Sequence, residues 1–168
     1  MRELRVIFDT NIYGLLIEET LMDLLPEKIH KDTSFLVYGF GPIRKELRNV
    51  PKKQKLGRLN KRNLVLTVYD KITKGRNLRP SVESVSLAKK YFEAYKAFKG
   101  VHGWTKMEMD FTIVACATLN RMDIVYSDDT STLSSMPAKK AYGKVNPKET
   151  LRTPTFWRYR ELKERYRD

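Results

Sequence analysis

The sequence predicts an α/β fold, because strand-like segments alternate with segments that have helical spacing. Short apolar runs typical of strands occur at residues 2–8, 34–38 and 124–126, and amphipathic segments lie between them. This order is typical of a mainly parallel sheet with helices on both faces. With 168 residues and 41% hydrophobic content, the chain can bury one core, so we expect a single domain over residues 1–168.

The first quarter of the chain is expected to form a strand, a helix, a second strand and the start of a second helix. Apolar residues alternate in 2–8, as in a strand with one buried face. Leucines recur at helical spacing in 12–29, and the apolar and aromatic run at 34–38 predicts the second strand. Gly41 and Pro42 then predict a helix start, because proline suits the first turn.

The middle of the chain is expected to alternate between basic and amphipathic segments. Residues 52–62 are rich in lysine and arginine and predict a basic helix or loop. Residues 64–69 predict a short strand. Residues 81–99 have the spacing of a long amphipathic helix, which Gly100 would end.

The last third of the chain is expected to hold two further helices around the strand at 124–126. Thr105 and Glu108 have the spacing of a capping box, which predicts a helix that runs from there to about residue 121. In that interpretation Glu108 binds backbone and is not a metal ligand. Residues 155–166 predict a final amphipathic helix, within a basic helical tail that starts at about residue 137.

The composition favours a soluble protein that binds nucleic acid. Lysine and arginine number 33 against 20 aspartates and glutamates, and the net charge of +13 points to RNA or DNA. No apolar run approaches the ~20 residues that span a bilayer, and the first residues do not resemble a signal peptide. Cys116 is the single cysteine and cannot form an internal disulfide. We therefore expect a cytoplasmic protein that does not bind membranes.

Four acidic residues occupy positions where the fold would otherwise place apolar side chains: Asp9, Glu46, Asp110 and Asp129. Asp9 and Asp129 follow strand-like runs, Glu46 shares a helical stripe with apolar residues, and Asp110 lies on the apolar side of the most hydrophobic helix. Ligands bind outside the carboxyl ends of strands in open parallel sheets, so the four acids can converge there. Because a buried unpaired carboxylate is costly, we expect a divalent cation among them.

Oxygen ligands favour Mg²⁺ or Mn²⁺ over zinc. On a basic protein, such a site suits phosphodiester hydrolysis. Taken singly, each acid has a simpler interpretation: Asp9 or Asp129 could cap a helix, Glu46 could face solvent, and Asp110 could pair with an arginine. The joint pattern at successive element boundaries favours the metal site.

These motifs resemble those of the PIN-domain nuclease family, especially toxins of the VapC type. The matching segments are 8–11 at the first strand end, 42–47 on the following helix, 110–117 on the apolar helix and 125–129 at the last strand end. The resemblance implies a Rossmann-like three-layer α/β/α sandwich and a ribonuclease activity. It also implies that the four acids are the metal ligands and catalytic residues.

The resemblance further implies that Thr10 or Asn11 and Ser127 orient the carboxylates through hydrogen bonds. Asp128, next to Asp129, departs from the single acid that the family usually has. Side chains alternate along an extended chain, so Ser127 and Asp129 should point to the same side. Asp129 is then the expected ligand, and Asp128 should point away, in a secondary role, or cap the following turn.

The resemblance implies RNA as the substrate, and a basic run close to Glu46 is interpreted as the track that binds it. A solvated surface is the simpler interpretation of this run, but its place beside a site acid favours RNA. An antitoxin protein and a second copy of the chain remain open as partners. The residues of the track are Lys52, Lys53, Lys55, Arg58, Lys61 and Arg62.

Three other functions fit parts of the sequence. A nucleic-acid-binding protein of the same fold with little or no cleavage would not require all four acids. A phosphatase of the haloacid dehalogenase kind would need an aspartate two residues after Asp9, where this chain has Asn11. A non-enzymatic role within a larger RNA-processing assembly remains open.

Overall fold

The computed structural model describes residues 2–19 and 24–168. Its centre is a five-stranded sheet in the order β5-β2-β1-β6-β7, and every neighbouring pair of strands in it is parallel. This confirms the predicted α/β class with a parallel sheet. The strands are β1 (Leu4–Phe8), β2 (Phe35–Phe40), β5 (Asn77–Leu78), β6 (Ile124–Tyr126) and β7 (Thr155–Trp157).

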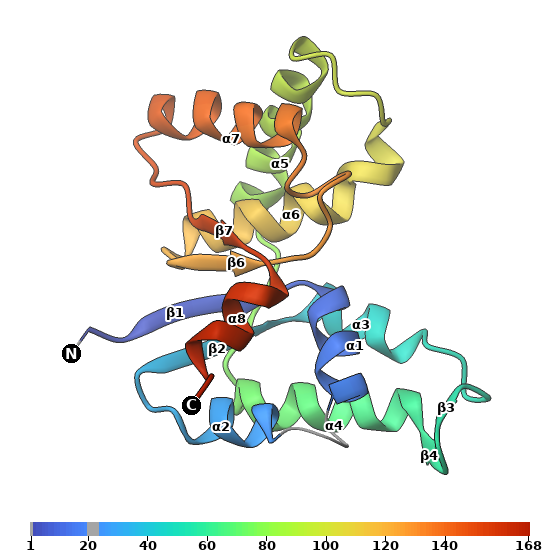
Figure 1. Ribbon diagram of the computed structural model, residues 1–168. Helices are drawn as coiled ribbons and strands as arrows, with labels where there is room; N and C mark the ends of the chain where they lie inside the picture. The colour runs from blue at the N-terminus through green and yellow to red at the C-terminus, as the bar shows by residue number, and fades with distance from the viewer. Residues whose placement is uncertain (1, 20–23) are drawn as a thin grey trace.

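Helices cover both faces of the sheet, as Figure 1 shows. Four helices lie on one face and pack on one another: α1 (Thr10–Glu19), α2 (Leu25–Lys31), α3 (Gly41–Arg48) and α4 (Lys61–Thr73). Three lie on the other face: α5 (Val82–Ala97), α6 (Trp104–Leu119) and α7 (Met136–Lys148). The last helix, α8 (Tyr159–Arg165), joins the face of α1 through a hydrogen bond from the Tyr159 hydroxyl to Glu19. This is the three-layer sandwich that the resemblance implied.

The core forms because the central strands are apolar on both faces. Val6, Ile7 and Phe8 of β1 are fully buried, as expected for a strand covered by helices on both sides. The register places Phe8 beside Tyr126 of β6. The carboxyl ends of β1 and β6 are therefore level, and the residues that follow them lie side by side.

Two expectations for the middle of the chain are wrong. Residues 64–69 are not a strand but belong to α4, where Val65, Val68 and Ile72 recur at helical spacing and are buried. Their β-branched side chains imitate a strand locally, and packing of one helical face decides the structure. Residues 52–62 are neither a helix nor a simple loop: β3 (Lys55–Leu56) and β4 (Leu59–Asn60) form an antiparallel hairpin, with Gly57 in the left-handed region at φ 63°.

Two helix boundaries also differ from expectation. The capping box of Thr105 and Glu108 does not form, because α6 starts at Trp104 with Gly103 as its N-cap. Residues 155–166 are not one helix. The β-branched and aromatic residues of β7 pair with β6, and α8 starts only at Tyr159.

The remaining expectations concern the ends of the chain. The predicted helix at 12–29 is described as α1 and α2, and residues 20–23 lie outside the described residues. The segment from about residue 137 contributes α7, the edge strand β7 and α8, so it is more than a helical tail. Among the described residues, no helix combines the length and apolar character needed to cross a membrane.

Candidate functional site: an acid cluster at the carboxyl ends of the strands

Asp9 lies at the centre of the candidate site, directly after β1, and only 6% of it is exposed. Its backbone N–H donates to the Tyr126 carbonyl at 2.9 Å, which ties the end of β1 to the end of β6. One carboxylate oxygen accepts from the Thr10 N–H at 2.8 Å. The other accepts from the Ser127 hydroxyl at 2.7 Å and the Asn11 amide at 3.1 Å. Among the described residues, the Asp9 carboxylate therefore has hydrogen-bond donors but no ion pair.

Asp110 lies in the second turn of α6 and faces the same point. Burial, followed by the charges of Asp9, Asp129 and Glu46, raises the pKa of Asp110 to about 7, although the nearby Thr132 hydroxyl opposes the rise. Burial also raises the pKa of Asp9, to which Glu46 and Asp129 contribute. The four predicted acids are therefore close enough to repel one another, and we call them the acid cluster.

Asp129 is held by the turn that follows it. One oxygen accepts from the Ser131 N–H at 3.1 Å and the Thr132 N–H at 2.9 Å. Burial alone would raise the pKa of Asp129, but the bonds from Thr132 and Ser131 outweigh it and lower the pKa below its usual value. Asp129 therefore keeps its charge more readily than Asp110.

Glu46 completes the cluster from the helix after β2. It is exposed, and its carboxylate accepts a hydrogen bond from the Thr10 hydroxyl. Gly41 and Pro42 start α3 directly at the end of β2, as predicted, and Ile43 and Leu47 bury one face of the helix. This packing leaves Glu46 at the rim of the cluster.

The predicted positioning residues contact the acids. Thr10 bonds both Asp9 and Glu46. The Ser127 hydroxyl donates to Asp9 and accepts from the Asp129 N–H at 3.0 Å. The Asn11 amide nitrogen donates to Asp9, and its oxygen accepts from the Asp128 N–H at 3.1 Å. These bonds lock the ends of β1 and β6 together.

Asp128 points away from the cluster, in line with the expectation, but its partner differs. Its carboxylate accepts from the Tyr159 N–H at 2.7 Å and lies 3.7 Å from the Arg158 Nε. It therefore caps α8, and the prediction that it caps the following turn is wrong, because Asp129 binds that turn. The sequence could not place α8 beside Asp128, since the two segments are 31 residues apart.

Thr132 is a site residue that the sequence interpretation missed. It is 2% exposed, and its hydroxyl bonds Asp129 and is within hydrogen-bonding reach of Asp110. The signal was present: hydroxyl residues two and three positions after an aspartate are typical of a turn that the carboxylate caps. The sequence could not show that Thr132 lies close to Asp110 of α6.

The donor set suits a hard divalent cation, since it consists of carboxylates with hydroxyl residues around them. Among the described residues, however, no three His, Cys, Asp or Glu side chains are arranged so that a single ion could contact all of them. Mg²⁺ usually keeps several water molecules and binds one or two carboxylates. The residues therefore fit an open, partly hydrated site and not a closed cage of protein ligands.

The predicted RNA track lies on the hairpin and the start of α4. Lys52, Lys53, Lys55 and Arg58 are exposed, and no ion pair involves them within the described part of the chain. Lys61 and Arg62 are half-buried in the first turn of α4, and Lys61 lies 3.9 Å from a carboxylate oxygen of Glu18.

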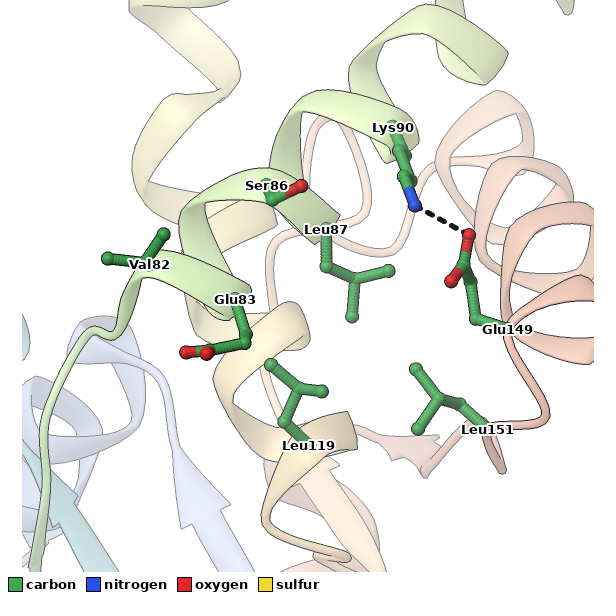
Figure 2. A pocket seen from close by; sticks show the side chains of 8 residues that line it. All are labelled: Val82, Glu83, Ser86, Leu87, Lys90, Leu119, Glu149 and Leu151. Atoms are coloured by element: carbon green, nitrogen blue, oxygen red, sulfur yellow. Dashed lines mark hydrogen bonds and ion pairs between the residues drawn. The ribbon is translucent and has the colours of Figure 1, made fainter.

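A hollow in the surface lies away from the acid cluster. Figure 2 shows it between α5, the end of α6 and the segment after α7. Its volume is ≈ 400 Å³. Leu87, Leu119 and Leu151 line it, and the ion pair of Lys90 with Glu149, at 2.6 Å, closes one side. It contains none of the acid cluster, so its size does not make it the centre of the chemistry.

Comparisons with known proteins support the fold. No protein-family model matches this chain. No curated protein matches it either. Among solved structures, a chain in the structure of FitAB bound to an IR36 DNA fragment is similar over 92% of this chain and 94% of its own, with a TM-score of 0.54 and 18% sequence identity. At that identity the likeness shows a shared fold, in agreement with the PIN-like α/β/α sandwich that the sequence motifs implied.

Proposed function

We propose that this protein is a nuclease of the PIN type that hydrolyses RNA phosphodiester bonds with the help of Mg²⁺ or Mn²⁺. One observation carries the proposal: four carboxylates lie near one another at the carboxyl ends of the strands, and no lysine or arginine pairs with any of them among the described residues. On a chain with a net charge of +13, this lack of a paired cation is best explained by a metal ion and a phosphate.

A divalent cation at this site would supply Lewis-acid chemistry, which activates water and stabilises negative charge on the phosphate. The residues of the chain would position that chemistry. Ser127 and Asn11 hold Asp9 in one orientation, and Thr132 holds Asp129 next to Asp110. The exposed lysines of the hairpin would attract the RNA backbone.

We further propose that the chain acts with a partner protein, as the toxin of a toxin–antitoxin pair. Two findings support this. The sequence motifs resemble those of VapC-type toxins, and the similar solved structure is that of FitAB with DNA. Co-expression with the product of the neighbouring reading frame tests it: the two proteins should co-purify, and the partner should suppress the cleavage.

The experiment for the nuclease itself uses labelled single-stranded RNA and purified protein. We expect cleavage with Mg²⁺ or Mn²⁺, none with EDTA, and little with Ca²⁺, whose looser coordination positions water badly. Asp110→Asn protein, purified in the same way, controls for contaminating nucleases. Undiminished cleavage in fully chelated samples would exclude the metal mechanism.

A second candidate is a nucleic-acid-binding protein of the same fold with little or no cleavage. It is favoured by the finding that, among the described residues, no three potential ligands can contact one ion together. The same assay separates the two. Tight RNA binding without cleavage at any Mn²⁺ concentration would favour the binding protein.

A further inference from the structure

A small hollow beside the acid cluster has the chemistry of a phosphate site. It has a volume of ≈ 50 Å³ and lies between the ends of β6 and β7 and the start of α7. Ser127, Thr130 and Ser134 supply hydroxyl groups, and Lys139 and Arg158 supply positive charge. A hollow of this size holds the oxygens of a phosphate group and is far smaller than the ~300 Å³ or more of typical ligand pockets.

The same hollow is bordered by an exposed aromatic ring. Trp157, the last residue of β7, is 40% exposed, which is unusual for so large an apolar side chain in this chain's described residues. Its ring makes an edge contact with the ring of Tyr126, with 6.0 Å between the ring centroids. A half-exposed tryptophan offers a ring face on which any nucleobase can stack.

The position of the hollow follows from the strand order. The site residues follow β1 and β6, and β7 is the next strand, so its end lies about one strand spacing, ~5 Å, from the end of β6. Ser127 belongs to both places, since it lines the hollow and donates to Asp9. The Ser127 N–H also donates to the Trp157 carbonyl at 2.9 Å.

The charges differ between the two places. The acid cluster is negative and can accept a phosphate only with a cation present. In the hollow, Lys139 has no ion pair among the described residues, and Arg158 has a single distant one, to Asp128 at 3.7 Å. A neighbouring phosphate is therefore attracted to the hollow itself, without a metal ion.

We propose that this hollow is a nucleotide subsite: Lys139 and Arg158 bind a phosphate next to the scissile one, and the ring of Trp157 stacks on the adjoining base. This inference rests on the proposed function, because it names where the single-stranded RNA lies on the same site. The RNA then runs along the carboxyl ends of the strands, over the acid cluster and onto β7.

The test measures binding and not cleavage. A labelled single-stranded RNA of about ten nucleotides is titrated against Asp110→Asn protein, and against the same protein with a second change. We expect Trp157→Leu, which keeps the apolar character and removes stacking, to weaken binding about five- to a hundredfold. Trp157→Phe should restore most of the affinity. Lys139→Gln should weaken binding and reduce the salt slope by ~0.7, and Lys140→Gln, its neighbour outside the hollow, should not.

A second probe separates the base from the phosphate. An oligonucleotide of the same length without bases should bind the Trp157→Leu protein as well as the parent, whereas Lys139→Gln should still weaken it. In a Trp104→Phe background, Trp157 is the single tryptophan, because the chain contains two. Its fluorescence should then be quenched by the RNA and not by the oligonucleotide without bases.

The subsite and the nuclease can fail separately. If Trp157→Leu only lowers the melting temperature and leaves RNA affinity unchanged, the ring covers the sheet edge and the subsite is disproved. If wild-type protein never cleaves RNA but the Trp157 and Lys139 changes still weaken binding selectively, the subsite stands and the nuclease proposal fails.

Discussion

Acidic residues at the amino ends and at the carboxyl ends of the parallel strands have different partners. At the amino ends of the strands, Asp123 precedes β6 with 10% of its side chain exposed and is paired with Arg2 at 2.8 Å and Arg152 at 3.2 Å. At the carboxyl ends, Asp9 is buried, and its carboxylate accepts from hydroxyl, amide and backbone donors, with no ion pair to an arginine or lysine among the described residues. Both carboxylates are largely shielded from solvent, and they differ in whether an arginine neutralises them.

The acid before β2 repeats this contrast. Asp32 lies 3.2 Å from Arg165 and accepts from the Tyr166 hydroxyl at 2.9 Å. Burial alone would raise the pKa of Asp32, but hydrogen bonds from Ser34, Tyr166 and Arg165 lower it to about 2. The pKa of Asp110 moves the other way, to about 7. Asp123 and Asp32 are thus paired with arginines, whereas no lysine or arginine forms an ion pair with the acid cluster among the described residues.

The largest expected difference is in catalysis. Asp110→Asn or Asp9→Asn should reduce metal-dependent RNA cleavage at least about a hundredfold, because metal chemistry contributes several kcal/mol. Asp123→Asn should leave cleavage by the folded fraction unchanged. Rates are compared at equal concentrations of folded protein, determined by circular dichroism. Wild-type rates in both cluster variants would remove the functional distinction between the two ends of the strands.

The stability contributed by the acids at the two ends of the strands should depend on pH with opposite signs. In the folded protein the pKa of Asp110 is about 7, above the ordinary value near 4. The stability that this group contributes is therefore full below about pH 4 and is lost as pH rises through 7. Without metal, the melting temperature of the wild type should fall over this window relative to that of Asp110→Asn. Added Mn²⁺ should recover the loss in the wild type.

For Asp32 the sign reverses. Its folded pKa of about 2 lies below the ordinary value, so its stabilisation is present above about pH 4 and is lost as pH falls towards 2. Asp32→Asn should lower the melting temperature at pH 7 and make little difference near pH 2. If the melting temperatures of Asp32→Asn and Asp110→Asn changed with pH in parallel, the acids at the two ends of the strands would not differ in charge compensation.

A smaller effect should separate the adjacent acids. Asp129→Ala should weaken Mn²⁺ binding by about tenfold or more, the scale found even for groups that only support a ligand. Asp128→Ala should lower the melting temperature, since its carboxylate caps α8 through the Tyr159 N–H, and should leave the affinity nearly unchanged. Titration calorimetry measures the affinity and circular dichroism the melting temperature. A larger loss of affinity from Asp128→Ala would transfer the ligand role to Asp128.

The smallest expected effect concerns the hairpin. Changing Lys52, Lys53 and Lys55 to Glu should weaken RNA binding and flatten its salt dependence by about 0.7 for each phosphate that these lysines neutralise. The matched control changes Lys140, Lys144 and Lys148 of α7, which are also exposed. Equal slopes for the hairpin variant and the wild type would place the RNA track elsewhere.

The sequence by itself determined the fold class and predicted the four acids of the candidate site. Alternating apolar runs required a parallel sheet, and the acids at Asp9 and Asp129 had to lie at the carboxyl ends of the strands because they follow them closely. Asp110 was predictable for a related reason: it interrupts an apolar stripe on a helix, where burial makes a lone carboxylate costly. Glu46 was chosen on the same ground, but the structure leaves it exposed at the rim of the cluster. Local pattern was sufficient for the acids that directly follow β1 and β6.

Only the tertiary structure decided what depends on contacts between distant segments. Residues 64–69 form a helix because their apolar face packs against α1, α2 and α3, which no local propensity reveals. Asp128 caps α8, and Thr132 joins Asp129 to Asp110, because β7 and α6 bring these segments together. The cations that neutralise Asp123 come from Arg2 and Arg152, far away in the sequence. The pairing of charges across the fold therefore distinguishes a structural acid from a candidate metal ligand, and spacing along the chain does not.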